Sequence, residues 1–150
     1  MDLGQLIERY RGTGQVPPHP VLLEERTPGG EEGERQVLLL PRRPRKDLVV
    51  GRSSSAPLCV PDPNVSSQHA RLLPPSPERK AWSLVDLGST NGTFVGAHAL
   101  EPHRPFALRD REQVRFGPTR TFRFLRPASL ERTLRELART LPRPRRRRAE

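Results

Sequence analysis

Cysteine is almost absent from this 150-residue sequence, which contains only Cys59. A single cysteine excludes an intrachain disulfide and a metal site built from cysteines, and it fits a reducing compartment. Long apolar runs are absent as well, because no stretch approaches the ~18 consecutive apolar residues of a membrane span. The first residues, Met1 to Gly4, lack the basic and apolar pattern of a secretory signal. We therefore expect a cytoplasmic protein without a membrane span.

Motifs of catalysis are missing too. The sequence has no phosphate-binding loop that ends in Gly-Lys-Ser/Thr, and no cluster of metal ligands at a recognised spacing. Ser66 and His69 resemble a nucleophile and a base, but no nucleophile elbow or third partner accompanies them. The sequence therefore predicts a binding protein rather than an enzyme, with no metal, no cofactor and no small-molecule substrate.

Apolar residues are scarce, at 33 % of the chain, and there are 18 prolines. Soluble domains usually contain about 45–50 % apolar residues, so part of this chain is expected to be poorly packed. All five phenylalanines and the only tryptophan lie between residues 82 and 124. This concentration predicts that the core is built largely from that region.

Positive charge is abundant, with a net charge of +10. Much of it lies in two clusters, which are Arg42, Arg43, Arg45 and Lys46, and the terminal Arg143 and Arg145–Arg148. Such clusters fit an anionic partner, and they fit equally well a solvated tail that keeps the protein soluble. The residues after the last helix are expected to be disordered.

Helical periodicity is found only at the two ends of the chain. The N-terminal apolar stripe has the spacing i, i+3, i+4, i+7 that is typical of a short helix; it consists of Leu3, Leu6, Ile7 and Tyr10. Asp2 can cap this helix and Gly12 can end it, and prolines follow at 17, 18 and 20. Residues 1–20 are therefore predicted to form a helix and a proline-rich linker.

A second apolar stripe near the C-terminus consists of Leu130, Leu134, Leu137 and Leu141. Ser129 is a plausible N-cap, and Pro142 ends the helix. The stripe fits either a docking helix for a partner or packing on the domain itself, for example beside the N-terminal helix, and we favour packing. Residues 128–150 are predicted to form this amphipathic helix and an arginine-rich tail.

Between these ends, residues 21–127 have the pattern of a separate β-domain, with short runs of strand-forming residues between turn formers. The predicted strands are 21–25, 35–40, 47–51, 58–60, 70–73, 81–86, 93–95, 98–100, 112–116 and 121–125. In three of these strands, two large apolar residues are separated by one polar or charged residue, so that the two apolar side chains share one face of the strand and the residue between them points outward. These pairs are Trp82/Leu84, Val114/Phe116 and Phe122/Phe124. Many short strands without an intervening helix predict an all-β sandwich, whose strand order the sequence leaves open.

Three polar patches fall where predicted strands meet loops. They are Gly51-Arg52, then Ser66-Ser67-Gln68-His69, then residues 86–94 with the sequence Asp-Leu-Gly-Ser-Thr-Asn-Gly-Thr-Phe. Each has an ordinary explanation alone; for example, Asn91-Gly92 is a strong hairpin signal. If the fold brings the patches to one edge, they offer a guanidinium fork, hydroxyl donors and a carboxamide. That set suits a phosphate ester on a peptide.

In their order and spacing, these three patches resemble the forkhead-associated (FHA) domain family over roughly residues 21–126. The resemblance implies an eleven-stranded sandwich of two antiparallel sheets, with the binding loops at one end. It also implies recognition of phosphothreonine in partner proteins, with a serine/threonine kinase or its substrate as the partner, and no catalysis.

The resemblance also implies a role for individual residues. Arg52 and Ser66 would contact the phosphate, Ser67 would add a polar contact, Thr90 would hold the phosphate or its loop, and Asn91 would bind the main chain of the target peptide. Three residues are expected to support the site: Gly51, His69 and Gly92. The chain departs from the family pattern at Ser67, where arginine is frequent, and at Gly96, where asparagine is common. Both changes are expected to weaken affinity.

Two other functions fit the same sequence. Binding of nucleic acid or another polyanion would depend on the arginine-rich tail and would fall steeply with salt. However, the aromatic residues fall at buried strand positions and offer no exposed stacking platform, so nucleic acid is the less favoured partner. A phosphate-independent FHA scaffold, acting through the sandwich faces or the leucine stripe, is the third possibility.

Overall fold

The computed structural model describes residues 1–25, 32–41, 43 and 47–143. The basic residues Arg42, Arg45, Lys46 and Arg145–Arg148, with residues 144–150 of the predicted disordered tail, lie outside the described residues. Within the described part, no helix is both long enough and apolar enough to cross a membrane.

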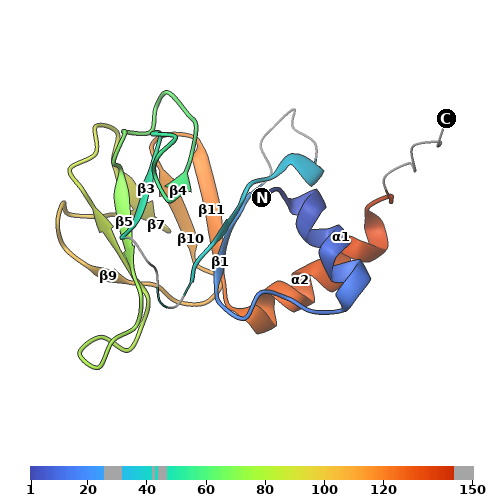
Figure 1. Cartoon of the computed structure of the whole chain (residues 1–150). Helices are drawn as coiled ribbons and strands as arrows, with labels where there is room; N and C mark the ends of the chain where they lie inside the picture. Colours follow the sequence, from blue (N-terminus) through green and yellow to red (C-terminus); the bar gives the residue numbers. More distant parts are fainter. Residues whose placement is uncertain (26–31, 42, 44–46, 144–150) are drawn as a thin grey trace.

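Eleven strands among the described residues form two sheets, which confirms the predicted β-sandwich (Figure 1). The six-stranded sheet has the order β2-β1-β11-β10-β7-β8, and the five-stranded sheet has the order β4-β3-β5-β6-β9. The bounds are β1 Val21–Glu24, β2 Val37–Leu39, β3 Leu48–Gly51, β4 Leu58–Cys59, β5 Ala70–Leu73, β6 Ser83–Asp86, β7 Thr93–Val95, β8 His98–Ala99, β9 Phe106–Ala107, β10 Gln113–Phe116 and β11 Arg120–Leu125.

Strand pairing differs from the sequence prediction in two places. β3 and β4 pair in parallel, with Val50 opposite Leu58, whereas every other pairing between the described strands is antiparallel. The chain turns after β3, where Ala56 N donates to Ser53 O, and it then runs beside β3 in the same direction. The sequence analysis also missed β9, a two-residue strand that is defined by its pairing with β6.

The core between the sheets is built from the predicted aromatic region. The inward-facing side chains of the three predicted pairs are all buried, and Phe116, Phe122 and Phe124 are fully buried. Arg115 and Arg123, between two of the pairs, are partly exposed as expected. Ser83, between Trp82 and Leu84, is instead buried; β6 is an inner strand of its sheet, and Ser83 pairs in register with Leu73 of β5 and Ala107 of β9.

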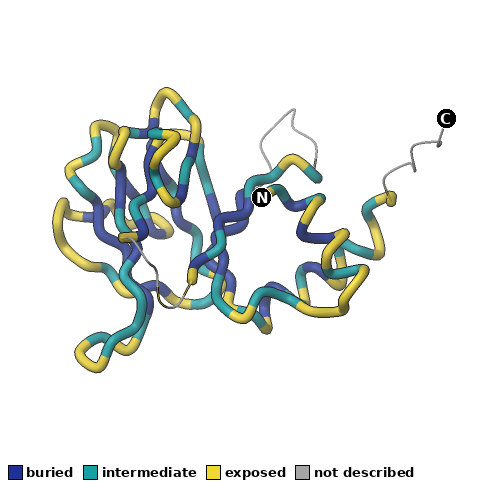
Figure 2. The backbone as a smooth tube through the Cα atoms, viewed as in Figure 1, coloured by how far each residue is buried: buried dark blue, intermediate teal, exposed yellow. Residues whose placement is uncertain are grey.

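The two helices, α1 (Leu3–Thr13) and α2 (Pro127–Thr140), lie together on the side of β1 that faces away from the five-stranded sheet (Figure 1). A short 3-10 helix, η1 (Glu32–Glu34), contacts α1. The facing sides of the helices are buried (Figure 2), and they form a second apolar cluster with the outer face of the six-stranded sheet. This cluster contains Leu3, Leu6, Ile7, Val21, Leu23, Val37, Leu125, Leu130 and Leu134. The predicted packing of the leucine stripe within the protein is therefore confirmed.

The ends of the helices differ partly from the prediction. Asp2 caps α1 as expected, with its carboxylate accepting from Gln5 N at 2.8 Å. Gly12 does not end the helix; Gly14 does, with a left-handed φ of 67°. Ser129 lies inside α2, which begins at Pro127. Its hydroxyl donates to Asp110, and Asp110 also accepts from Arg126 N and so satisfies the start of the helix from another loop.

Candidate functional site

The five predicted binding residues lie together at one end of the sandwich. The loops that follow β3, precede β5 and connect β6 to β7 enclose an open cleft of about 290 Å³. The residues that line it are Arg52, Pro63, Asn64, Val65, Ser66, Ser67, Thr90 and Asn91. The structure thus brings the three sequence patches to one place, and it adds the 63–65 segment.

Arg52 follows β3 directly, and its side chain is exposed in this cleft. One guanidinium nitrogen donates to Pro63 O at 3.2 Å, and the other donates to the Ser67 hydroxyl at 3.4 Å. Both bonds are long and both acceptors are uncharged. Among the described residues no carboxylate pairs with this guanidinium, so its charge remains available to an external anion.

Gly51 permits the close approach of two loops. A Cβ atom at this position would lie 2.0 Å from Ser67 O and 2.7 Å from Ser67 C, which no side chain can tolerate. The backbones are in contact here, because Arg52 N donates to Ser66 O at 2.9 Å. The missing side chain of Gly51 is therefore what allows Arg52 and the two serines to line the same cleft.

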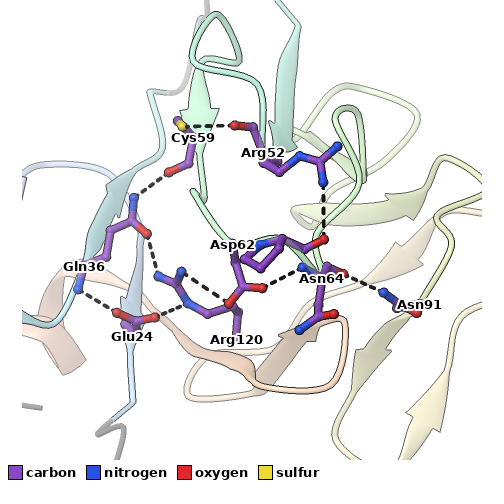
Figure 3. A network of polar contacts seen from close by, with 9 residues as sticks. Glu24, Gln36, Arg52, Cys59, Asp62, Asn64, Asn91 and Arg120 are labelled. Carbon is purple, nitrogen blue, oxygen red and sulfur yellow. Dashed lines mark hydrogen bonds and ion pairs between the residues drawn. The ribbon is translucent and has the colours of Figure 1, made fainter.

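The hydroxyl and amide groups of the cleft are fixed by bonds between loops. Ser66 Oγ accepts from Thr90 N at 3.1 Å, which leaves the hydroxyl proton of Ser66 able to donate to a ligand. The side-chain amide of Asn91 donates to Asn64 O at 2.9 Å (Figure 3). The 86–93 turn is thus tied to the 63–66 segment at two points.

His69 joins the same two loops from below the cleft. It is fully buried, Nδ1 accepts from Ser66 N at 3.0 Å, and Nε2 donates to Gly92 O at 2.8 Å. Burial lowers the pKa of His69, and this outweighs the opposite effects of Gly92 and Asp86. The neutral ring with its proton on Nε2 satisfies both bonds, whereas a second proton on Nδ1 would remove the acceptor for Ser66 N.

Asp86, which was not among the predicted site residues, organises the third loop. It is buried at the end of β6, and its carboxylate accepts from the hydroxyls of Ser89 and Thr93 and from the backbone N–H groups of Gly88 and Ser89. Burial alone would raise the pKa of Asp86, but the bonds from Ser89, Thr93 and Gly88 hold it below the usual value. An aspartate followed by Gly-Ser at this spacing was a usable signal in the sequence.

Gly92 and Gly117 complete the geometry. Gly92 has a left-handed φ of 87°, which glycine adopts readily, and its carbonyl accepts from Gly117 N at 2.9 Å. The predicted Asn91-Gly92 hairpin is wrong, because the flanking strands β6 and β7 belong to different sheets and this segment connects the two. A Cβ atom on Gly117 would lie 2.8 Å from Asn64 O. The contact between Gly117 and Asn64 joins distant parts of the chain, so no local pattern could have shown it. Gly96 lies in the β7–β8 turn, outside the cleft, and its N–H donates to Gln113 O.

The comparisons with known proteins agree with this arrangement. The family model for the FHA domain matches residues 48–117, which contain all the residues that line the cleft.

The chain contains an FHA domain.

Relatives of this FHA domain include the nuclear inhibitor of protein phosphatase 1 of Homo sapiens, which is 32 % identical over 115 residues; the match covers 74 % of this chain and 29 % of that protein. The chain spans less than a third of the length of the curated relatives it matches.

Two solved FHA domains have the same fold and share 25 % sequence identity with this chain. The solution structure of the FHA domain of an Arabidopsis thaliana hypothetical protein has a TM-score of 0.56 and covers 75 % of this chain and 88 % of its own. The yeast Dun1 FHA domain, solved with a doubly phosphorylated (pT) peptide derived from Rad53 SCD1, has a TM-score of 0.56 and covers 74 % of this chain and 75 % of its own.

Proposed function

We propose that this FHA domain binds phosphothreonine in partner proteins and catalyses no reaction. The observation that carries the proposal is the cleft itself, in which the exposed guanidinium of Arg52, with which no carboxylate of the described residues pairs, lies beside the Ser67 hydroxyl and lines the same cleft as Ser66, Thr90 and Asn91. A phosphothreonine carries a charge of about −1.5 to −2 and three acceptor oxygens near pH 7. The cleft offers a cation and neutral donors to match them.

Each residue has a role in this proposal. The planar fork of Arg52 exchanges its two weak internal bonds for charge-assisted bonds to two phosphate oxygens. The hydroxyl proton of Ser66 serves a further oxygen, Ser67 adds a polar contact, and Thr90 holds the phosphate or its loop. Asn91 exchanges its bond with Asn64 O for bonds with the main chain of the target peptide.

The solved Dun1 FHA domain supports the type of ligand, because that relative was determined with a peptide phosphorylated on threonine. The partner of this chain is proposed to be a serine/threonine kinase or one of its substrates. The same proposal includes the cytoplasmic location expected from the sequence, which the lone Cys59 supports.

The affinity that follows from the cleft is modest. A hydrogen bond to a charged group contributes roughly 1.5–3 kcal/mol, and the cleft offers three or four such bonds. Ordering a flexible peptide removes part of this gain. A dissociation constant of roughly 1 μM, or about 8 kcal/mol, is the expected result, and it suits a reversible signalling contact.

The test is a screen of phosphothreonine peptides with matched phosphoserine and unphosphorylated versions. The proposal predicts binding to a subset of the phosphothreonine peptides and none to the same sequences without phosphate. Binding that ignores phosphate would instead support a scaffold role. Binding of every acidic sequence, lost at raised salt, would support a nonspecific polyanion surface.

A further inference from the structure

Arg120, at the start of β11, lies outside the cleft and outside the segment that the FHA family model matches. Its Nε donates to Glu24 Oε2 at 2.6 Å, and one terminal nitrogen donates to Gln36 Oε1 at 3.1 Å. Gln36 in turn donates through its backbone to Glu24 Oε1 and through its side chain to Cys59 O. This group joins β1, β11 and the entry of β2 to the end of β4 (Figure 3).

The other terminal nitrogen of Arg120 reaches the loop that forms one wall of the cleft. It lies 3.9 Å from Asp62 Oδ2, and the two side chains are each only 16 % exposed. The second oxygen of Asp62 accepts from Asn64 N at 2.8 Å, and its carbonyl accepts from Val65 N at 3.0 Å. Asp62 thus holds the turn of the 62–65 segment through two hydrogen bonds, and Arg120 is the cation that contacts Asp62.

Two residues of the proposed phosphopeptide site depend on this segment. Pro63 O accepts from the guanidinium of Arg52, and Asn64 O accepts from the side-chain amide of Asn91. Figure 3 shows the continuous path from Glu24 through Arg120, Asp62 and Asn64 to Asn91. A shift of the carbonyl groups of residues 62–64 would therefore move two side chains together: Arg52, which is proposed to bind the phosphate, and Asn91, which is proposed to bind the main chain of the peptide.

We propose that Arg120 is a positioning residue for the cleft, which acts through Asp62 on Arg52 and Asn91 without touching the peptide. Arg120 is the one cation that faces both Glu24 and Asp62 among the described residues. Without it, two carboxylates that are mostly buried lose their counter-charge, and the Asp62 loop loses its attachment to the six-stranded sheet. The part of the proposal that concerns affinity rests on the proposed function, whereas the part that concerns loop position does not.

The chain provides a control on the same sheet, in an ion pair that is more exposed than that of Arg120 and Glu24. Arg123 of β11 forms an ion pair with Glu25, which directly follows β1, and within the described part of the chain this pair makes no hydrogen bond or ion pair with the residues that line the cleft. Arg120→Met and Arg123→Met each remove one arginine–glutamate pair from the six-stranded sheet. Arg120→Lys keeps the charge opposite both carboxylates and loses the planar fork.

The first measurement uses the full chain without peptide and follows the side-chain amide resonances of Asn91 by NMR. Arg120→Met is expected to shift them, Arg120→Lys to shift them less, and Arg123→Met to leave them in place. The second measurement is the affinity for a phosphothreonine peptide, which we expect to fall roughly tenfold in Arg120→Met and to stay unchanged in Arg123→Met.

Unshifted Asn91 resonances in Arg120→Met, or equal effects of the Arg123→Met control, would overturn the proposal. If Arg120→Met does not fold, Asp62→Ala cuts the same path from the loop side, and unmoved Asn91 resonances in that variant would likewise overturn it. If the parent protein binds no phosphothreonine peptide, the proposed function fails, and the Asn91 resonances still decide whether Arg120 positions the loop.

Discussion

Replacing Arg52 with alanine should separate binding from folding. The guanidinium is exposed and makes only two long bonds to uncharged acceptors, at 3.2 and 3.4 Å. Its loss should therefore lower the free energy of unfolding by less than about 1 kcal/mol. In a complex the same group makes two charge-assisted bonds, each contributing roughly 1.5–3 kcal/mol. The expected loss of binding energy is about 3–6 kcal/mol, or roughly 10²–10⁴-fold in affinity.

Isothermal titration calorimetry with a phosphothreonine peptide from the screen measures this loss, and chemical denaturation measures stability in parallel. Starting from roughly micromolar affinity, Arg52→Ala should have a dissociation constant of roughly 0.1–10 mM, which is at or beyond the limit of detection. Arg135→Ala is the control, because Arg135 is exposed on α2 and its removal lowers the net charge equally. Retained affinity in Arg52→Ala would refute the reasoning. An equal loss in Arg135→Ala would also refute it, since it would show a general effect of charge.

Three further predictions concern the supports of the site and the helices. Gly51→Ala should destabilise the fold by roughly 3 kcal/mol, because the new methyl group would meet Ser67 O. The control Gly12→Ala should be neutral or stabilising, because there is open space around Gly12. Chemical denaturation distinguishes the two variants, and equal stabilities would contradict the close approach at Gly51. Burial lowers the pKa of His69 in the folded protein from its usual 6.5, so the contribution of the neutral ring to stability is complete above pH 6.5. The free energy of unfolding should decline as the pH falls below this value, by at most about 1.4 kcal/mol per pH unit. A denaturation series in which the parent shows no such decline relative to His69→Gln would contradict a buried, neutral ring. Leu134→Ala, at a fully buried position of α2, should cost about 2–5 kcal/mol, and a change of about 0.5 kcal/mol or less, which is typical of surface sites, would mean that the helix is not part of the core.

Local patterns predicted most of the strands because each inward-facing pair packs into one core. Val114/Phe116 and Phe122/Phe124 alternate with arginines that remain partly exposed, so the period of two is visible in the sequence. β6 departs from this alternation, because Ser83 is buried although its position between Trp82 and Leu84 predicted an exposed side chain. Non-local contacts explain the other differences: β9 is defined by β6, and the start of α2 is satisfied by Asp110 from another loop.

The three motifs of the cleft were visible because they consist of short, contiguous segments. Gly51-Arg52 and the Asn91-Gly92 turn carry their geometry in one or two residues each. The parts that the sequence could not show depend on residues far apart in the chain. Gly117 packs against Asn64, and Arg120 lies beside Asp62, only after both sheets have formed. Their types and spacing carry no local signal, so the structure is needed to find them.

The most direct test of phosphothreonine binding is an NMR titration of the isotope-labelled protein with one phosphothreonine peptide and its unphosphorylated counterpart. If the cleft is the binding site, only the phosphorylated peptide should shift its resonances, above all the Nε–H of Arg52, the backbone amides of Ser66, Ser67 and Thr90, and the side-chain amide of Asn91. Shifts of equal size with the unphosphorylated peptide, or shifts confined to α2 and other surfaces away from the cleft, would contradict phosphothreonine binding at this site.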